Sequence, residues 1–249
     1  MTAPERAPLG AALALLLTLI SLTGPLSPVV MATFVALLTV LLGIAWPGLL
    51  ELRSAVGTAV VMAGTGIAGA VIVSAPSDRI APMTGIVMAC AVGVFASFVH
   101  QMLRRDRRDL TASLTGTVAG VFAAGVAACW VLAQAQAAAE GRAALVSAIA
   151  AGLAATLLIN ATALPAGLRF VLSAGAGAGV TAALASALLA VSLPLAIGLG
   201  LVVAIGGSCA HLLAGSSLVA REPVPSLAVA VVPVATIGVV AHLAVMLLP

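Results

Sequence analysis

The feature that most constrains this chain is a succession of long apolar segments separated by short polar turns. A membrane-crossing α-helix needs about 20 apolar residues to cover roughly 30 Å of hydrocarbon. Nine segments approach or reach that length, at about residues 9–23, 29–50, 56–75, 82–103, 110–133, 143–163, 170–191, 193–213 and 227–248. The sequence therefore predicts a single integral membrane domain over residues 1–249, an all-α polytopic transmembrane helical bundle of about nine spans.

The composition excludes several classes of protein. Hydrophobic residues make up 63% of the 249 residues and charged residues only 7%, whereas a typical soluble domain carries about 25% charged residues. Such a chain could not cover a water-exposed surface with solvated groups, so a soluble globule, a disordered chain and a nucleic-acid-binding domain are excluded. Every basic residue is an arginine, which removes the lysine of a P-loop or of a Schiff-base enzyme.

The arginines predict an orientation. If nine spans alternate across the membrane, one side holds eight arginines, namely Arg6, Arg53, Arg104, Arg105, Arg107, Arg108, Arg169 and Arg221. The other side holds only Arg79 and Arg142. Because cytoplasmic turns carry the excess of basic residues, the N-terminus is expected in the cytoplasm and the C-terminus outside. The many Ala, Gly and Arg residues, with no Lys, favour a GC-rich bacterial genome and hence the plasma membrane.

The interiors of the predicted spans hold small and apolar residues. No Asp, Glu or Arg lies in the middle of a span, which argues against an ion-coupled transporter because such proteins place ionisable groups there. Glycines in the spans, among them Gly116 with Gly120 and the run Gly175, Gly177 and Gly179, predict close packing between helices.

The tryptophans and cysteines also have expected places. Trp46 and Trp130 are expected near the ends of their spans, where indole rings prefer to lie. Cys90, Cys129 and Cys209 each lie within an apolar run and are interpreted as small buried hydrophobic residues. Since no cluster of Cys, His and carboxylate residues is in view, neither a metal nor another cofactor is expected.

The most polar stretch of the chain is a candidate ligand site. Arg104, Arg105, Arg107 and Arg108 fall in a turn on the predicted cytoplasmic side. They are either an anchor that fixes the topology or a site for anionic lipid head groups or a phosphate-bearing ligand, because guanidinium groups bind phosphate through paired hydrogen bonds.

Asn160 is a second candidate, because it is an amide inside a predicted span with Thr156 one turn before it. An unpaired amide in hydrocarbon costs several kcal/mol, so Asn160 must face protein or a water-filled cavity. It is interpreted either as an interhelical hydrogen-bonding residue or as part of a polar site.

Two stretches resemble phosphatidate cytidylyltransferase, the membrane enzyme that makes CDP-diacylglycerol from CTP and phosphatidic acid. Residues 108–113, RDLTAS, resemble the stretch that enters the fifth span of that family, and residues 217–222, SLVARE, resemble the start of its signature S-x-x-K-R-D. The resemblance implies nine spans with short loops and adds Arg221 to the candidate site residues.

The chain also departs from that family. Ala220 replaces the lysine of the signature, and the polar block that should follow is missing before residue 227. The aspartate of the family's sixth span corresponds to Asn160, an amide without the negative charge that holds Mg²⁺. The resemblance therefore implies a relative that has lost cytidylyl transfer and retains a lipid- or partner-binding role at the cell envelope.

Two other functions stay open from the sequence. A small permease or exporter component is compatible with many apolar spans, although no inverted repeat of broken helices is visible. A membrane assembly subunit is the other alternative, in which the glycine-rich faces bind a membrane-protein partner or a second copy of the chain. In each case membrane lipids are the expected surroundings.

Overall fold

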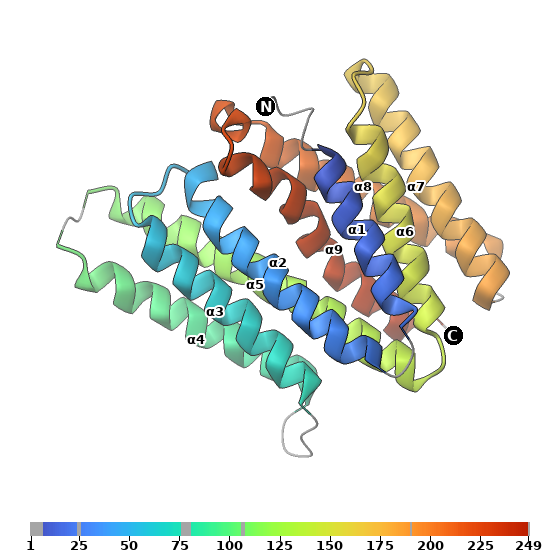
Figure 1. The fold of residues 1–249 in the computed structure, drawn as a ribbon, viewed down its shortest axis with the longest axis horizontal. Helices are drawn as coiled ribbons and strands as arrows, with labels where there is room; N and C mark the ends of the chain where they lie inside the picture. Colours follow the sequence, from blue (N-terminus) through green and yellow to red (C-terminus); the bar gives the residue numbers. More distant parts are fainter. Residues whose placement is uncertain (1–6, 24–25, 76–80, 106–107, 190, 249) are drawn as a thin grey trace.

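The computed structural model describes residues 7–23, 26–75, 81–105, 108–189 and 191–248. Within these residues the chain forms nine α-helices and a short 3₁₀ helix, with no strand (Figure 1). They are α1 (Ala7–Ser21), α2 (Ser27–Leu49), α3 (Ala55–Ser74), α4 (Pro82–Leu103), α5 (Leu110–Ala139), α6 (Ala143–Asn160), α7 (Ala166–Leu189), α8 (Leu193–Gly215), η3 (Leu218–Arg221) and α9 (Pro225–Leu247).

Eight of the described helices, α2 to α9, are long and apolar enough to cross a membrane. This confirms the predicted class, an all-α multi-pass membrane protein. The first predicted span is shorter than a full crossing, because α1 has 15 residues and an α-helix rises only about 1.5 Å per residue.

The helices form two groups on either side of α9. Helices α2, α3, α4 and α5 pack against one another, and α1, α6, α7 and α8 form the second group. Helix α9 contacts α2 and α5 on one side and α1 and α8 on the other, so it lies in the middle of the molecule (Figure 1). Its burial follows from its sequence, which is apolar on every side rather than along one stripe.

Most predicted bounds agree with the helices, and α5 is the main exception. It continues to Ala139, six residues beyond the predicted end. Gln134 lies just beyond the predicted end, and its side chain is fully buried. Its amide Nε2 donates to Ser27 Oγ at 2.8 Å and to the Ser21 carbonyl at 3.3 Å, so the helix keeps this polar residue inside the protein.

Helices α2 and α5 end in the same hydrogen-bonded turn, in which one residue adopts a left-handed backbone conformation. The residue at that position differs between the two helices. At the end of α2 this position is Glu51, with φ of 52°, and at the end of α5 it is Gly141, with φ of 70°. The turn satisfies the last helical carbonyls. Glycine adopts this conformation without strain, whereas glutamate does not.

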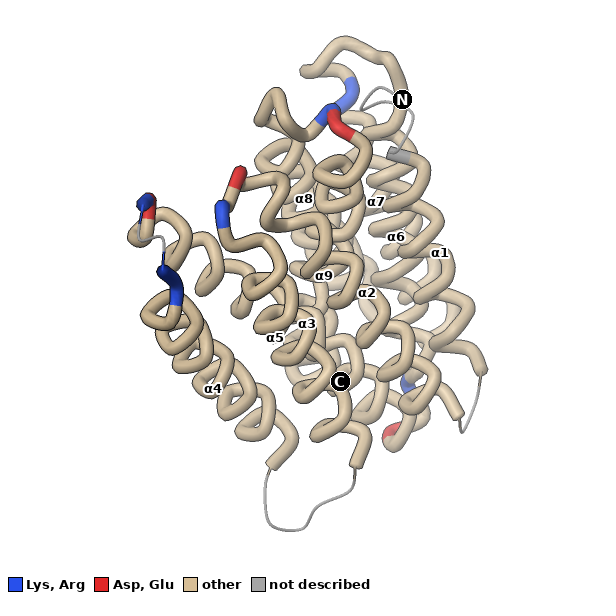
Figure 2. Tube along the Cα trace, turned by 60° about the vertical axis from the view of Figure 1, so that its left-hand side comes forward, with Lys and Arg blue, Asp and Glu red and all other residues tan. Residues whose placement is uncertain are grey.

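The charged residues lie at the two ends of the bundle. Six of the seven described arginines lie at one end, called here the arginine-rich end (Figure 2), namely Arg53, Arg104, Arg105, Arg108, Arg169 and Arg221. Arg142 lies at the opposite end, where its guanidinium donates to the carbonyls of Val245, at 3.0 Å, and Leu248 and so caps α9. Arg6, Arg79 and Arg107 lie outside the described residues.

Trp130 does not lie near the end of its helix, because α5 continues to Ala139, and that prediction is wrong. Trp130 belongs to α5 and its ring is fully buried inside the bundle. Its Nε1 donates to the Val234 carbonyl of α9 at 2.7 Å. Trp46 lies near the end of α2 as expected, where its Nε1 donates to the Gly116 carbonyl at 2.9 Å. Burial of Trp130 follows from the central place of α9, which a single helix sequence does not reveal.

The glycines divide into packed and open positions. A Cβ at Gly120 would lie 2.3 Å from Met62 Sδ, and one at Gly116 would lie 3.0 Å from Leu52 Cδ2, so this pair packs inside the chain rather than offering a face to a partner. Gly175 and Gly179 have no such neighbour within 4 Å.

The cysteine interpretation is correct for Cys129, which is buried, and Cys90 is half-buried. It is wrong for Cys209, which is exposed on the outer face of α8.

Candidate functional site

A cluster of hydrogen-bonded hydroxyl groups joins α3 and α5 at the arginine-rich end. Ser54 precedes α3, and its Oγ lies 2.7 Å from Ser113 Oγ in the first turn of α5. One turn deeper, Thr58 Oγ1 lies 2.9 Å from Thr117 Oγ1. Ser54 and Thr58 lie on one side of α3, and Ser113 and Thr117 on one side of α5, because the residues in each set are four apart. All four side chains are buried.

Gln101 of α4 connects this cluster to Arg104. Its side chain is 1% exposed, and its Nε2 donates to Ser54 Oγ at 3.1 Å and to Ser113 Oγ at 2.9 Å. Its carbonyl Oε1 accepts from Arg104 Nη1 at 2.7 Å, and the same nitrogen donates to Ser113 Oγ at 3.3 Å. The network holds the guanidinium in one position, which reduces the conformational entropy lost when a ligand binds.

The charges around this network are mainly positive. Arg53, Arg104, Arg105 and Arg108 lie in the α2–α3 and α4–α5 turns, and the described acidic residues of these turns are Glu51 and Asp109. Arg53 Nε donates to Asp109 Oδ2 at 2.9 Å, with side chains 53% and 64% exposed. Exposed ion pairs contribute little stability, so this pair orders the two turns more than it stabilises them.

Asn160 belongs to a different cluster. It ends α6 and is 6% exposed. Its Nδ2 donates to Ser208 Oγ of α8 at 3.1 Å, and Ser208 Oγ lies 3.1 Å from Ser173 Oγ of α7. Asn160 therefore joins three helices that do not include α4 or α5. Hydrogen bonding between helices is one of the two roles that the sequence suggested for it.

Arg221 is separate as well. It ends η3 and is exposed, whereas the neighbouring Ala220 is buried. Ser217 Oγ accepts from the Ala220 backbone N–H at 3.1 Å, so this serine caps a short turn between α8 and α9. Of the sequence-predicted site residues, only Arg104, Arg105 and Arg108 lie together, and Arg107 is outside the described residues.

The histidines lie on separate helices, and the described part of the chain holds no group of three or more potential metal ligands. His211 of α8 lies beside the backbone of Val229 in α9.

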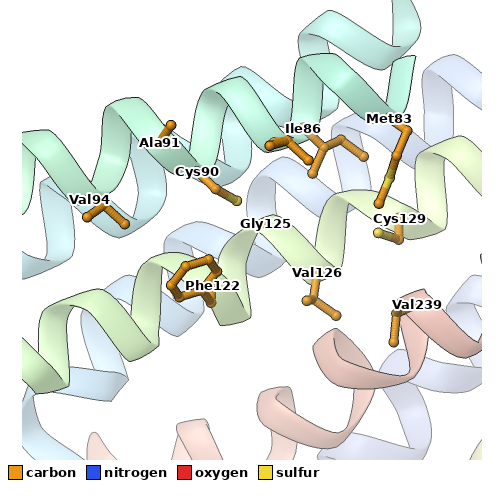
Figure 3. Close-up of a pocket in the computed structure, with 11 residues that line it drawn as sticks. Met83, Ile86, Cys90, Ala91, Val94, Phe122, Gly125, Val126, Cys129 and Val239 are labelled. Carbon is orange, nitrogen blue, oxygen red and sulfur yellow. The ribbon is translucent and has the colours of Figure 1, made fainter. Parts of the chain in front are cut away.

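The prominent cavities are apolar and lie at the outer surface. One, of about 360 Å³, runs between α4 and α5 and reaches α9, with Phe122, Cys90 and Cys129 in its wall (Figure 3). Another, of about 440 Å³, lies between α3 and α4, and a third, of about 450 Å³, between α8 and α9. These surfaces are suited to hydrocarbon rather than to a polar reaction.

Sequence reasoning missed the buried part of the site, Ser54, Thr58, Gln101, Ser113 and Thr117. A usable signal existed, because Ser54 and Thr58, like Ser113 and Thr117, are four residues apart at the start of apolar spans. Nothing in the sequence indicates that these two pairs meet. Comparisons of the chain with models of protein families, with curated proteins and with solved structures found no match.

Proposed function

We propose that this integral membrane protein binds the phosphate groups of anionic phospholipids at the arginine-rich end, at the turns that carry Arg53, Arg104, Arg105 and Arg108. The observation that carries the proposal is the buried network of Gln101 and Ser113, which holds the Arg104 guanidinium at the turn that also carries Arg105 and Arg108. The role is one of binding, and no reaction is assigned to the site.

Two features favour a lipid phosphate over a plain topology anchor. An anchor needs only charge at the membrane surface, whereas Arg104 is tied by two hydrogen bonds to a buried network. The turns also offer several guanidinium groups close together, and guanidinium groups bind phosphate through paired, charge-assisted hydrogen bonds. Basic groups next to the membrane surface attract the head groups of anionic lipids.

The proposal places the arginine-rich end in the cytoplasm. Six of the seven described arginines lie there, and cytoplasmic turns carry the excess of basic residues. The phospholipid is then drawn from the inner leaflet of the plasma membrane of a bacterium, with the N-terminus on the cytoplasmic side.

Titration of the detergent-purified protein with phosphatidylglycerol or phosphatidylcholine, followed by native mass spectrometry, tests this role. We expect the anionic lipid to bind more tightly, and Arg104→Gln to weaken its binding by roughly ten- to a hundredfold, the range for a hydrogen bond to a charged group. Arg221→Gln is the matched control, because it removes the same charge from the same end of the bundle outside the network.

Equal affinity for the two lipids would refute the proposal. Loss of binding in Arg221→Gln but not in Arg104→Gln would move the site to the turn between α8 and α9. That result would favour the resemblance to phosphatidate cytidylyltransferase, since Arg221 lies in the stretch that carries it.

A further inference from the structure

The groove between α3 and α4 is formed by one face of each helix, from Val60 to Ile72 on α3 and from Met88 to Ala96 on α4. Thr65 is a polar residue in its wall, and its hydroxyl donates to the Val61 carbonyl within α3 at 2.8 Å. The groove has a volume of about 440 Å³, and the surface that it presents to the outside of the bundle is almost wholly apolar.

The two helix faces that form the groove run toward the arginine-rich end of the bundle. Residues three or four apart share a helix face, so the groove face of α3 continues from Val60 to Gly57 near the start of the helix, and Arg53 lies in the turn just before it. The groove face of α4 continues from Ala96 through His100 to Arg104.

His100 closes the space between the groove and the arginines. A Cβ at Gly57 would lie 1.9 Å from His100 Cε1, so the imidazole occupies the gap between the two helices. His100 Nε2 is buried and has no hydrogen-bond partner among the described residues. From the arginine-rich end inward, the order is thus guanidinium groups, the His100 imidazole and then the apolar groove.

The part of the groove nearest to the arginines lies at the depth of one leaflet, and the lining continues along α3 to Ile72. Val60 is six residues below Ser54, which is about 9 Å along the helix, and Gly64 is ten residues below, which is about 15 Å. Half of a bilayer's hydrocarbon core is also roughly 15 Å thick. The stretch of groove from Val60 to Gly64 therefore lies where an acyl chain of a lipid in the arginine-rich leaflet would lie.

The other two grooves do not match this leaflet. In the groove of Figure 3, Val94 is the lining residue of α4 nearest to Arg104, ten residues or about 15 Å away, and the lining continues to Met83. The groove between α8 and α9 is lined by the start of α8 and the end of α9, at the opposite end of the bundle.

We infer that the α3–α4 groove seats one acyl chain of the anionic phospholipid whose phosphate lies against Arg53 and Arg104. This inference rests on the proposed function and adds the place of the chain. A phospholipid carries an anionic phosphate, ester groups and an apolar chain in the same order as the arginines, His100 and the groove. The ligand class is therefore a long-chain anionic phospholipid rather than a soluble phosphate compound.

Two glycines provide the test. Gly64 lines the groove and a Cβ there meets no atom within 4 Å, so Gly64→Leu fills the groove without displacing a neighbour. Gly179 of α7 is equally open and lies outside the groove, which makes Gly179→Leu the matched control. Val60→Phe blocks the upper part of the groove at a side chain that is 66% exposed and therefore tolerant of a larger residue.

The measurement is the binding of dioleoyl- and dioctanoyl-phosphatidylglycerol to the full chain in detergent, by native mass spectrometry. Gly64→Leu is expected to weaken binding of the long-chain lipid by about three- to tenfold, in line with packing energies inside membranes. It should leave the short-chain lipid unchanged, because the octanoyl chain ends above Gly64. Val60→Phe should weaken both lipids, and Gly179→Leu neither.

The results separate the two proposals. If Gly64→Leu and Val60→Phe bind the long-chain lipid like Gly179→Leu, while Arg104→Gln weakens both lipids, the groove inference is wrong and the head-group site stands. If Arg104→Gln changes the binding of neither lipid, the proposed function itself fails.

Discussion

The three glycines of the run Gly175, Gly177 and Gly179 should respond differently to the same substitution. In the sequence they are equivalent, each with an alanine before it. In the structure only Gly177 faces the bundle, where a Cβ would lie 2.1 Å from Thr156 Oγ1 and 3.1 Å from the Gly152 carbonyl oxygen.

The magnitude follows from these contacts. Replacement of a helical glycine by alanine favours the helix by about 0.5–1 kcal/mol at all three positions. At Gly177 the added carbon also overpacks the helix contact, because Thr156 Oγ1 is held by the Gly152 carbonyl at 2.9 Å and that carbonyl belongs to the backbone. Overpacking typically costs about 1–3 kcal/mol, so the Gly177→Ala protein should be less stable than Gly175→Ala by that amount.

Thermal unfolding in detergent, followed by circular dichroism, measures the difference. One kcal/mol shifts the Tm of a chain of this size by about 2–4 °C, so Gly177→Ala should melt about 2–12 °C below Gly175→Ala and Gly179→Ala. Equal Tm values for the three variants would refute the packing of α6 against α7 at Gly152 and Thr156.

Three further predictions concern the turns, the network and the reaction. Glu51→Gly should stabilise the protein by about 1 kcal/mol and Gly141→Glu destabilise it by about as much, because only glycine adopts the left-handed turn without strain; shifts of Tm in the same direction would contradict these turns. Ser113→Ala should cost about 1–3 kcal/mol by leaving Gln101 with fewer partners, whereas an exposed serine such as Ser216 should tolerate alanine with little change in Tm. Incubation with CTP, phosphatidic acid and Mg²⁺ should give no CDP-diacylglycerol, and turnover by the pure protein would overturn the inferred loss of cytidylyl transfer.

The helices could be predicted from the sequence because the membrane imposes their length. A run of about 20 apolar residues has few other structures available to it, since backbone groups in hydrocarbon must bond within the helix. The bounds of α4 agree with the prediction at both ends. Prolines at the start of α2, α4, α8 and α9 mark first turns, where no N–H is needed.

The packing of the helices could not be predicted, because apolar spans of similar composition carry little information about their neighbours. From the sequence Trp130 is expected near the end of its span, yet it is fully buried, and so is Gln134. The arginine cluster was visible as a run in the sequence. The network that holds Arg104 was not, because it is assembled from turns that are about 50 residues apart in the chain.

Cysteine labelling on intact cells tests the central claim most directly. In a variant without native cysteines, Glu51→Cys reports from the arginine-rich end and Glu140→Cys from the opposite end, at two exposed positions. We predict that a membrane-impermeant maleimide labels Glu140→Cys on intact cells and labels Glu51→Cys only after permeabilisation. Labelling of both residues from the same side, or of Glu51→Cys alone on intact cells, would contradict a bundle that crosses the membrane with its arginines in the cytoplasm.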